Sequence, residues 1–386
     1  MPVRKINMGM VGGGPGSLIG QIHVRGAQLD GQIELVCGAF DIDPANSKIQ
    51  GAAYYLDPSR TYDTFQEMIA AEAALPEDVR MDFLSITTPN HVHYEPARLA
   101  LENGFHVVSD KPLTNNTEDA RKLVSLVEKT GLIFAVTHAY TGYPMVKEAR
   151  HMVQSGKLGK IRKVISEYPQ GWLSKPMEGK GIMQADWRLD PKRSGRSNCI
   201  GDIGTHALNL AEYVTGLNVT QLCADVSTMV EGRRLDDDGN ILVRFDNGAR
   251  GIIYASQISA GEENGLKFRL YGEKGGLEWI QTEPNTLIVK WLDKPMEIVR
   301  PGNPWCSDIA QYNSRFPGGH PEGLIEAFGN VYRNIATCIQ HRLEGQEPPA
   351  EALDFPTVYD GLRGMLFIDS VIDSSESENK WLDFLT

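Results

Sequence analysis

Cysteine is scarce in this sequence, and its spacing carries no metal or disulfide signature. The five cysteines of the 386-residue chain stand far apart, at positions 37, 199, 223, 306 and 338. Structural zinc sites use closely spaced cysteine pairs, and disulfide frameworks are dense in cysteine. We therefore expect reduced thiols and a cytoplasmic location.

Long apolar runs and an excess of basic residues are also missing. No apolar stretch approaches the ~20 residues of a membrane-spanning helix. The first residues lead directly into a strand pattern, without the apolar core of a secretory signal. The chain has 38 basic and 50 acidic residues, a formal net charge of -12, whereas nucleic-acid binders cluster Lys and Arg. We expect a protein that binds neither membranes nor nucleic acid.

The N-terminal part alternates short apolar runs with helical stretches. At roughly 150 residues per domain, the length predicts two domains. Strands are expected over 7–11, 33–40, 81–87, 105–109 and 132–137, and helices over 64–73, 96–103 and 117–130. This alternation predicts an α/β domain over residues 1–138, with a parallel sheet and crossover helices.

The pattern changes after about residue 139, where strands follow one another closely. They are expected over 163–168, 221–230, 240–245, 249–257, 266–271, 276–281 and 286–291, and helices over 143–155, 206–215, 323–342 and 358–374. Close spacing predicts a C-terminal α+β domain, residues 139–386, with a large, mostly antiparallel open sheet. The acidic run Asp236 to Asp238 is interpreted as a solvated turn rather than a metal site.

A glycine-rich turn follows the first strand and opens the first helix. A backbone without side chains can approach a pyrophosphate there, and the helix N-terminus favours the anion. Gly12 and Gly14 match the first two glycines of a Rossmann dinucleotide fingerprint, while Gly20 comes about three residues late for the third. The predicted cofactor-binding residues of this turn are Gly12, Gly14, Gly16, Ser17, Leu18 and Ile19.

The second strand ends at Asp41. A carboxylate there accepts hydrogen bonds from an adenosine ribose and repels a 2′-phosphate, which favours NAD over NADP. Asp41 could instead only cap a turn with Asp43 and Pro44. NADP stays an alternative, because Ser47 and Lys48 would serve a phosphate if their loop folded inward.

Two polar motifs follow strand or helix boundaries. Asp110-Lys111-Pro112 closes the fourth strand, at the sheet edge where doubly wound folds bind ligands, so Lys111 is a candidate catalytic cation. Further along, Asp202 and His206 are four residues apart at a helix start and would share one face. On residue types alone, Asp202 could equally cap the helix and His206 pack in its first turn.

In this order and spacing, the glycine turn, the Asp-Lys-Pro and the Gly-Asp-x-Gly-x-His motif resemble the glucose–fructose oxidoreductase / inositol dehydrogenase / rhizopine catabolism family, over essentially the whole chain. The sequence departs from the family in Asp110, where glutamate is usual, and in a longer glycine loop. The resemblance implies an NAD(P)-dependent oxidoreductase that forms homodimers or homotetramers.

The resemblance also implies roles for particular residues. Lys111, Asp202 and His206 match the catalytic group. The loop after the third strand would line the ribose and nicotinamide, and the loop with His320 would lie near the active cleft. The residues carried over to the cofactor are Thr88, Asn90, His93, Asp110 and Lys111. His91 and His93 have no acidic or cysteine partner nearby in the chain, so we expect no metal.

Aromatic and amide residues gather in the second domain, around its first strand and before the Asp/His motif. Aromatic faces pack against the C–H faces of a sugar ring, and amides and phenols match its hydroxyls. Arg188 and Arg193 leave room for one anionic group. The predicted substrate residues are Lys111, Tyr140, Tyr168, Trp187, Arg188, Asp202, His206 and His320.

These features predict an NAD(P)-dependent dehydrogenase that transfers a hydride between nicotinamide and a ring secondary alcohol of a sugar, glycoside or inositol-like polyol. Two alternatives stay open. An NAD-dependent glycosidase would use the same fold and regenerate its cofactor. A nucleotide-sensing regulator would bind the dinucleotide without turnover.

Overall fold

The computed structural model describes residues 4–384. The chain folds into two compact units. Residues up to 114, 118–139 and 324–362 form the first, and residues 115–117, 140–323 and those from 363 onward form the second. The sequence-based division at 138/139 assigns cofactor and substrate roles to the two parts and stays a prediction. The structure adds that residues 324–362 fold with the N-terminal part.

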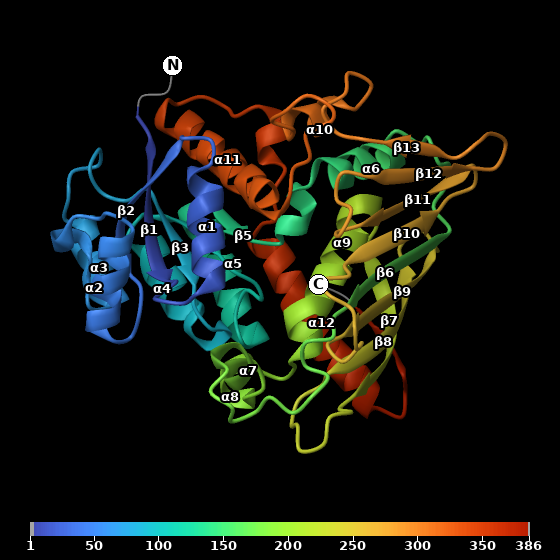
Figure 1. Ribbon diagram of the computed structural model, residues 1–386, viewed down its shortest axis with the longest axis horizontal. Helices are drawn as coiled ribbons and strands as arrows, with labels where there is room; N and C mark the ends of the chain where they lie inside the picture. Colours follow the sequence, from blue (N-terminus) through green and yellow to red (C-terminus); the bar gives the residue numbers. More distant parts are fainter. Residues whose placement is uncertain (1–3, 385–386) are drawn as a thin grey trace. The chain divides into compact units, whose positions relative to one another are not determined.

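The first unit contains a five-stranded parallel sheet (Figure 1). Its strands are β1 (Ile6–Gly12), β2 (Ile33–Ala39), β3 (Phe83–Thr87), β4 (His106–Ser109) and β5 (Phe134–Val136), in the order β2-β1-β3-β4-β5. The crossover segments contain α1 (Leu18–Gln28), α2 (Pro44–Ala53), α3 (Phe65–Ala73), α4 (Tyr94–Glu102) and α5 (Thr117–Thr130). This confirms the predicted Rossmann sheet, whose carboxyl edge carries the glycine turn, Asp41, Thr88 and Asp110.

Helix α11 (Leu324–Leu343) returns to the first unit and packs against α1. The hydroxyl of Tyr332 on α11 lies 2.7 Å from Nδ1 of His23 on α1 and 2.8 Å from Oγ of Ser85 in β3. All three side chains are completely buried. Burial lowers the pKa of His23 to about 4, so its ring is neutral at neutral pH. One phenol thus joins a C-terminal helix to the first helix and a central strand.

The second unit contains a nine-stranded sheet. Its strands are β6 (Lys163–Pro169), β7 (Val219–Ser227), β8 (Asp238–Phe245), β9 (Arg250–Ser256), β10 (Lys267–Tyr271), β11 (Gly275–Ile280), β12 (Leu287–Trp291), β13 (Glu297–Val299) and β14 (Trp381–Asp383). Their order is β13-β12-β11-β10-β6-β9-β8-β7-β14. Every pair of neighbours is antiparallel except β6 and β9. This confirms the predicted, mostly antiparallel open sheet.

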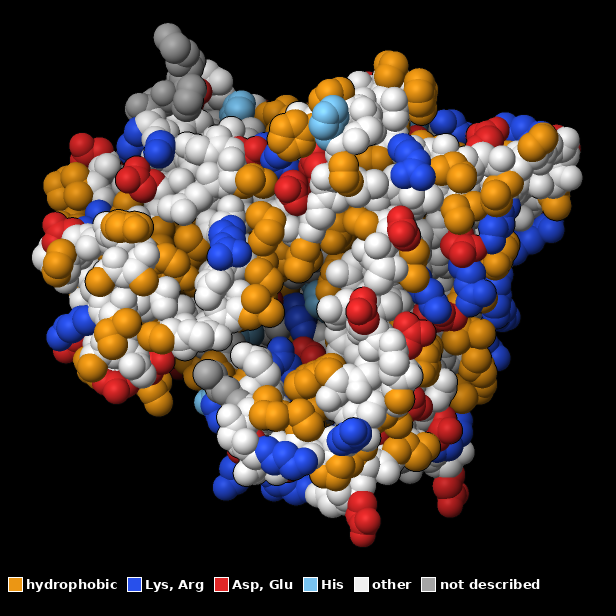
Figure 2. All heavy atoms as spheres, viewed as in Figure 1, with side chains coloured by type: hydrophobic (Ala, Val, Ile, Leu, Met, Phe, Trp, Pro, Cys, Tyr) orange, Lys and Arg blue, Asp and Glu red, His pale blue; other side chains and the backbone are white. Residues whose placement is uncertain are grey.

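The two faces of this sheet differ in chemistry. Helices α6 (Pro144–Gln154) and α9 (Thr205–Thr215) pack on one face, and α9 lies against β6, β9 and β10. The other face carries ion pairs. Glu167 on β6 contacts both Lys267 at 2.8 Å and Arg269 at 2.6 Å. Figure 2 shows charged and hydrophobic side chains mixed over these strands, at the right of the view.

The remaining elements are mostly short. Helices α7 (Met183–Arg188), α8 (Pro191–Ser194) and α10 (Asp308–Tyr312) were not predicted, nor were α2, β13 and β14. Helix α12 (Val358–Glu376) begins in the first unit and ends in the second. All five cysteines are free thiols. Within residues 4–384 no helix is both long and apolar enough to cross a membrane, and the cytoplasmic location stays a prediction.

We predict that Tyr332→Phe lowers the free energy of unfolding of the first unit by about 1–3 kcal/mol, because His23 and Ser85 each lose a buried hydrogen-bond partner. Urea denaturation followed by circular dichroism measures the change. The matched control is Tyr359→Phe, since the Tyr359 hydroxyl only reaches Glu128 at the surface. Equal midpoints for the two variants would contradict the assigned role of Tyr332.

Candidate functional site

Helix α1 packs closely against the backbone of the glycine turn that follows β1. A Cβ built on Gly20 would lie 2.4 Å from the Cα of Gly13, so α1 approaches the turn as only glycine permits. Ser17 caps the helix by accepting a hydrogen bond from the N–H of Gly20. Gly20 therefore supplies the close helix packing of the fingerprint's third glycine, although it stands late in the sequence.

Asp41 lies directly beside this turn. A Cβ on Gly14 would come within 2.7 Å of Oδ2 of Asp41, while Oδ1 accepts a hydrogen bond from the N–H of Asp43 at 2.9 Å. The carboxylate thus also closes a local turn, as the capping alternative expected. A side chain at position 14 would collide with the Asp41 carboxylate, so glycine lets the backbone of the turn approach that carboxylate closely. These residues fit a dinucleotide whose ribose meets a carboxylate.

Ser47 and Lys48, considered as an alternative site for a 2′-phosphate, both lie on α2. The Ser47 hydroxyl is completely buried, accepts from the N–H of Phe40 at 3.0 Å and donates to the carbonyl of Tyr62 at 3.0 Å. Lys48 forms an ion pair with Asp63 at 3.3 Å. The Ser47 hydroxyl is therefore occupied within the first unit, whereas the Lys48 side chain is largely exposed.

The loop after β3 carries the three residues predicted to line the nicotinamide side. Asn90 and His93 are buried, and the ring nitrogens of His93 lie 2.8 Å from the carbonyl oxygens of Thr88 and Pro112. Burial lowers the pKa of His93, while the hydrogen bonds to the two carbonyls oppose that shift. His93 thereby joins this loop to the Lys111–Pro112 segment. The Thr88 hydroxyl is buried without a hydrogen-bond partner in the described part of the chain.

Lys111 follows β4 and precedes a cis peptide bond to Pro112. Its N–H donates to Oδ1 of Asp110 at 2.9 Å, and the same oxygen accepts from Oγ1 of Thr137 at 2.8 Å. His138 is buried next to this segment, and burial together with the charge of Lys111 lowers its pKa to about 3. A neutral imidazole therefore adds no second positive charge beside the Lys111 ammonium.

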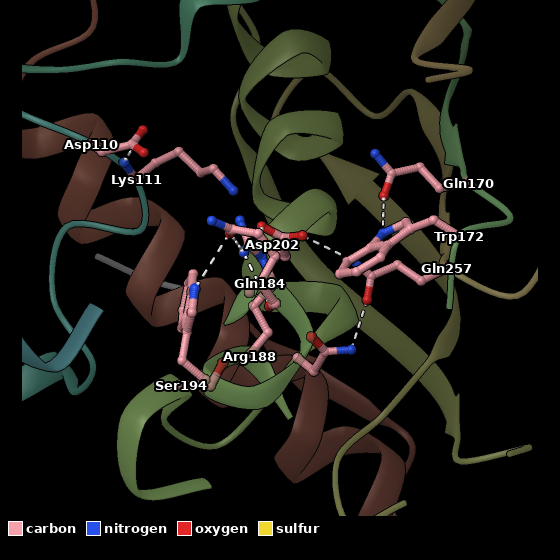
Figure 3. A network of polar contacts seen from close by, with 12 residues as sticks. Asp110, Lys111, Gln170, Trp172, Gln184, Arg188, Ser194, Asp202 and Gln257 are labelled. Atoms are coloured by element: carbon pink, nitrogen blue, oxygen red, sulfur yellow. Dashed lines mark hydrogen bonds and ion pairs between the residues drawn. The ribbon is translucent and has the colours of Figure 1, made fainter. Parts of the chain in front are cut away.

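Asp202 and His206 lie within the second unit at the start of α9. Residues Ile200–Gly204 form a π-helical turn, a local widening of the helix that is frequent at functional sites. Asp202 is not the N-cap residue of α9, which is Gly204, whereas His206 is buried in the first turn of α9 as the packing alternative expected. Its Oδ1 lies 3.2 Å from Nε of Arg188, and its Oδ2 accepts from Nε2 of Gln257 at 2.8 Å (Figure 3).

The π-helical turn is held by a buried carboxylate, that of Asp236. Its Oδ1 accepts from the N–H of Asn198 at 2.8 Å, and its Oδ2 accepts from the N–H of Ile200 at 2.8 Å and from the Ser197 hydroxyl at 3.0 Å. Burial raises the pKa of Asp236. The interpretation of residues 236–238 as a solvated turn is wrong for Asp236 and Asp237, because both are buried. The described residues contain no cluster of three or more metal-ligating side chains.

His206 packs against two tyrosines of the same unit. Its ring meets that of Tyr140 edge-on at 4.7 Å between centroids and that of Tyr168 at 6.0 Å. The two phenol oxygens are 2.5 Å apart, and burial raises the pKa of Tyr168, which keeps that phenol protonated. His206 is therefore surrounded by neutral aromatic groups that can donate and accept hydrogen bonds.

An amide cluster extends from these tyrosines. Asn264 accepts from the Gln170 amide at 2.6 Å and from the Tyr168 hydroxyl at 3.3 Å, and Gln170 in turn accepts from the Trp172 indole at 3.1 Å. Gln170 is buried, whereas Trp172 is partly exposed. Gln170 and Trp172 were not among the predicted substrate residues, although they belong to the aromatic and amide group around the first strand of this domain. Asn264 and Gln257 were missed because lone amides carry no spacing signal.

Two further predicted substrate residues lie on α7. The Arg188 guanidinium stacks on the Trp187 ring at 4.2 Å and hydrogen-bonds the Gln184 side chain, so it is held near Asp202 as Figure 3 shows. His320 is exposed instead, and its Nδ1 donates to the carbonyl of Pro317 at 3.0 Å. The structure brings Arg188 and Asp202 into contact. It also brings Tyr140, Tyr168 and His206 into contact with one another.

Two family models match this chain. Residues 6–138 match a family model described as an oxidoreductase family with an NAD-binding Rossmann fold, and residues 146–278 match the GFO/IDH/MocA C-terminal domain. Together the two models cover most of the chain.

Three similar proteins span nearly the full length. An oxidoreductase structure from Sinorhizobium meliloti is 40% identical, with a TM-score of 0.88 over 98% of this chain and 99% of that chain. An inositol dehydrogenase homolog from Azotobacter vinelandii, complexed with NADH and myo-inositol, is 32% identical, with a TM-score of 0.91 over 99% of this chain and 98% of that chain. The uncharacterized oxidoreductase YfiI of Bacillus subtilis is 32% identical, over 99% of this chain and 97% of its own length.

We predict that Gly20→Ala weakens NAD⁺ binding by about 10- to 100-fold, because the added methyl group pushes α1 away from Gly13 and displaces the turn. Isothermal titration calorimetry with NAD⁺ measures the affinity. The control is Gly364→Ala in α12, where the nearest atom to the new Cβ is 3.5 Å away and helix propensity improves. Unchanged affinity in Gly20→Ala would remove the turn from the cofactor site.

Proposed function

Because the chain belongs to the GFO/IDH/MocA oxidoreductase family and has its NAD-binding Rossmann domain, we propose that it is an NAD-dependent dehydrogenase of a cyclic polyol or pyranose. The reaction would oxidise a ring secondary alcohol. The observation that carries this proposal is the second unit's cluster of a carboxylate, an imidazole, two phenols and the side-chain amides of Gln170, Gln257 and Asn264.

The first unit supplies the residues proposed to hold the dinucleotide. The turn at Gly12, Gly14 and Gly16, with Ser17, Leu18 and Ile19 at the helix start, would bind the pyrophosphate through backbone N–H groups. Asp41 would accept hydrogen bonds from the adenosine ribose. Thr88 and Asp110 lie on loops at the same sheet edge, and Asn90 and His93 support them from within. Bound NAD⁺ supplies the hydride acceptor.

The proton chemistry is assigned to side chains of this chain. His206 accepts the hydroxyl proton of the substrate, because a neutral imidazole takes up and returns a proton near neutral pH. Lys111 donates a hydrogen bond to the reacting oxygen and stabilises its developing negative charge. Asp202 orients the substrate and stabilises the imidazolium that His206 becomes.

The neutral character of the amide and phenol groups supports a polyhydroxylated, uncharged substrate. Tyr140, Tyr168 and Trp187 offer aromatic faces and hydroxyl or indole groups that match a sugar ring. Arg188 is already paired with Asp202, so it does not offer a free charge to an anionic substrate. We also propose that the chain forms homodimers or homotetramers through the charged and apolar outer face of the nine-stranded sheet.

A substrate panel tests the function. We expect that myo-inositol, scyllo-inositol or a simple pyranose or glycoside produces NADH at 340 nm, in proportion to the alcohol consumed. An NAD-dependent glycosidase would release sugar without accumulating NADH, and a nucleotide-sensing regulator would bind NAD⁺ with no turnover on any member of the panel.

We predict that Lys111→Ala lowers kcat by about 100- to 1000-fold, because the reacting oxygen loses a charged hydrogen-bond donor. NAD⁺ affinity should stay within threefold of wild type, which fluorescence titration with NADH measures. The control is Lys129→Ala at the exposed end of α5. Near-normal turnover of Lys111→Ala would remove this residue from the mechanism.

A further inference from the structure

Both oxygens of the Asp202 carboxylate have fixed neighbours within the second unit. The Arg188 guanidinium lies 3.2 Å from Oδ1, and the Gln257 side chain donates to Oδ2 at 2.8 Å (Figure 3). Gln257 stands directly after β9 and is completely buried. A buried amide beside a catalytic carboxylate restricts how that carboxylate turns.

The direction of the Gln257 amide is set by a second buried amide. Nδ2 of Asn198 donates to Oε1 of Gln257 at 2.6 Å and to the carbonyl oxygen of Asp236 at 3.1 Å. A backbone carbonyl only accepts, so Asn198 has to present its NH₂ group to this corner. Gln257 then presents its carbonyl to Asn198, and its NH₂ group is left facing Asp202.

The far end of this chain of amides is the buried carboxylate of Asp236. It accepts the N–H of Asn198 at 2.8 Å and fixes the segment from which Asn198 extends. The N–H of Asp202 also donates to the carbonyl of Asn198 at 2.7 Å. Asn198 is therefore held by main-chain and side-chain hydrogen bonds. Its fixed NH₂ group in turn fixes the orientation of the Gln257 amide.

We infer that Gln257 is a positioning residue, which acts on the reaction through Asp202 and is itself oriented by Asn198 and Asp236. A donor faces Oδ2 and a cation faces Oδ1, so a proton on either oxygen would replace an attraction by a repulsion. Asp202 consequently stays a carboxylate of fixed orientation, and the substrate proton goes to His206. This role rests on the proposed function. It assigns orientation of the substrate to Asp202 and acceptance of the proton to His206.

The experiment is a double-mutant cycle on kcat with the best substrate of the panel. Gln257→Leu should lower kcat by about 10- to 100-fold, with NADH affinity near that of wild type. Its melting temperature should fall, because the buried Asn198 side chain loses an acceptor, so kcat is measured well below that temperature. In the Asp202→Asn background, the same substitution should change the residual kcat by less than about twofold, because the carboxylate on which Gln257 acts is gone.

Two companion variants separate hydrogen-bond donation from packing. Gln257→Glu keeps the size of the side chain but places a like charge against Asp202, so it should lose at least as much kcat as Gln257→Leu. Gln221→Leu is the matched control. Gln221 lies on β7, near the edge of the nine-stranded sheet. It also donates to an aspartate, Asp383, at 2.8 Å and accepts from Arg244 at 2.8 Å. Its kcat should stay within twofold of wild type.

Three results would overturn the inference. Gln257→Leu could retain more than half of the wild-type kcat, or lose the same factor with and without Asp202. Gln257→Glu could also keep full activity. Failure of the proposed function is distinct, since the wild-type chain itself would then oxidise no member of the panel.

Discussion

The buried carboxylate of Asp236 is the interaction on which the second unit's candidate site depends. Moving a carboxylate out of water is costly, and its raised pKa records that cost. The N–H groups of Asn198 and Ile200 and the Ser197 hydroxyl offset it. These residues lead into the π-helical turn that carries Asp202. The buried Asp236 thus orders the backbone, the amides and finally the carboxylate proposed to face the substrate.

The glycine turn of the first unit depends on a different constraint. There the constraint is close backbone approach, since Gly20 of α1 leaves no room for a side chain against Gly13. The helix N-terminus and the carboxylate of Asp41 are thereby placed at one edge of the parallel sheet. Steric fit positions the cofactor residues, whereas hydrogen-bonded polar groups position those proposed to handle the alcohol.

Much of the fold followed from periodicity, but the polar interior did not. Alternating strands and helices predicted the parallel sheet, and closely spaced strands predicted the antiparallel one. Helices α7 and α8 were missed because six or fewer residues make less than two helical turns. Strands β13 and β14 were missed because neither of these three-residue strands lies in a longer apolar run. Helix α2 is longer, but its small and polar residues gave no apolar pattern.

The site shows the same limit. Motif order placed Lys111, Asp202 and His206 correctly at element boundaries, and their chemical roles stay predictions. Asp236 looked solvated because a run of three acidic residues is typical of a surface, and its partners lie 36 to 39 residues away in the chain. Gln257 gave no signal at all, since a glutamine after a strand acquires meaning only from the tertiary neighbours Asn198 and Asp202.

The return of α11 to the first unit has a consequence for how this chain is made and divided. Tyr332 and His23 are separated by 309 positions, so a ribosome must release almost the whole polypeptide before the first unit can complete its core. A fragment ending at residue 138 would expose the apolar side of α1 that Phe328 and Tyr332 cover. An isolated cofactor module therefore requires residues 324–362 to be grafted back, and chimaeras between relatives should exchange both segments as one piece.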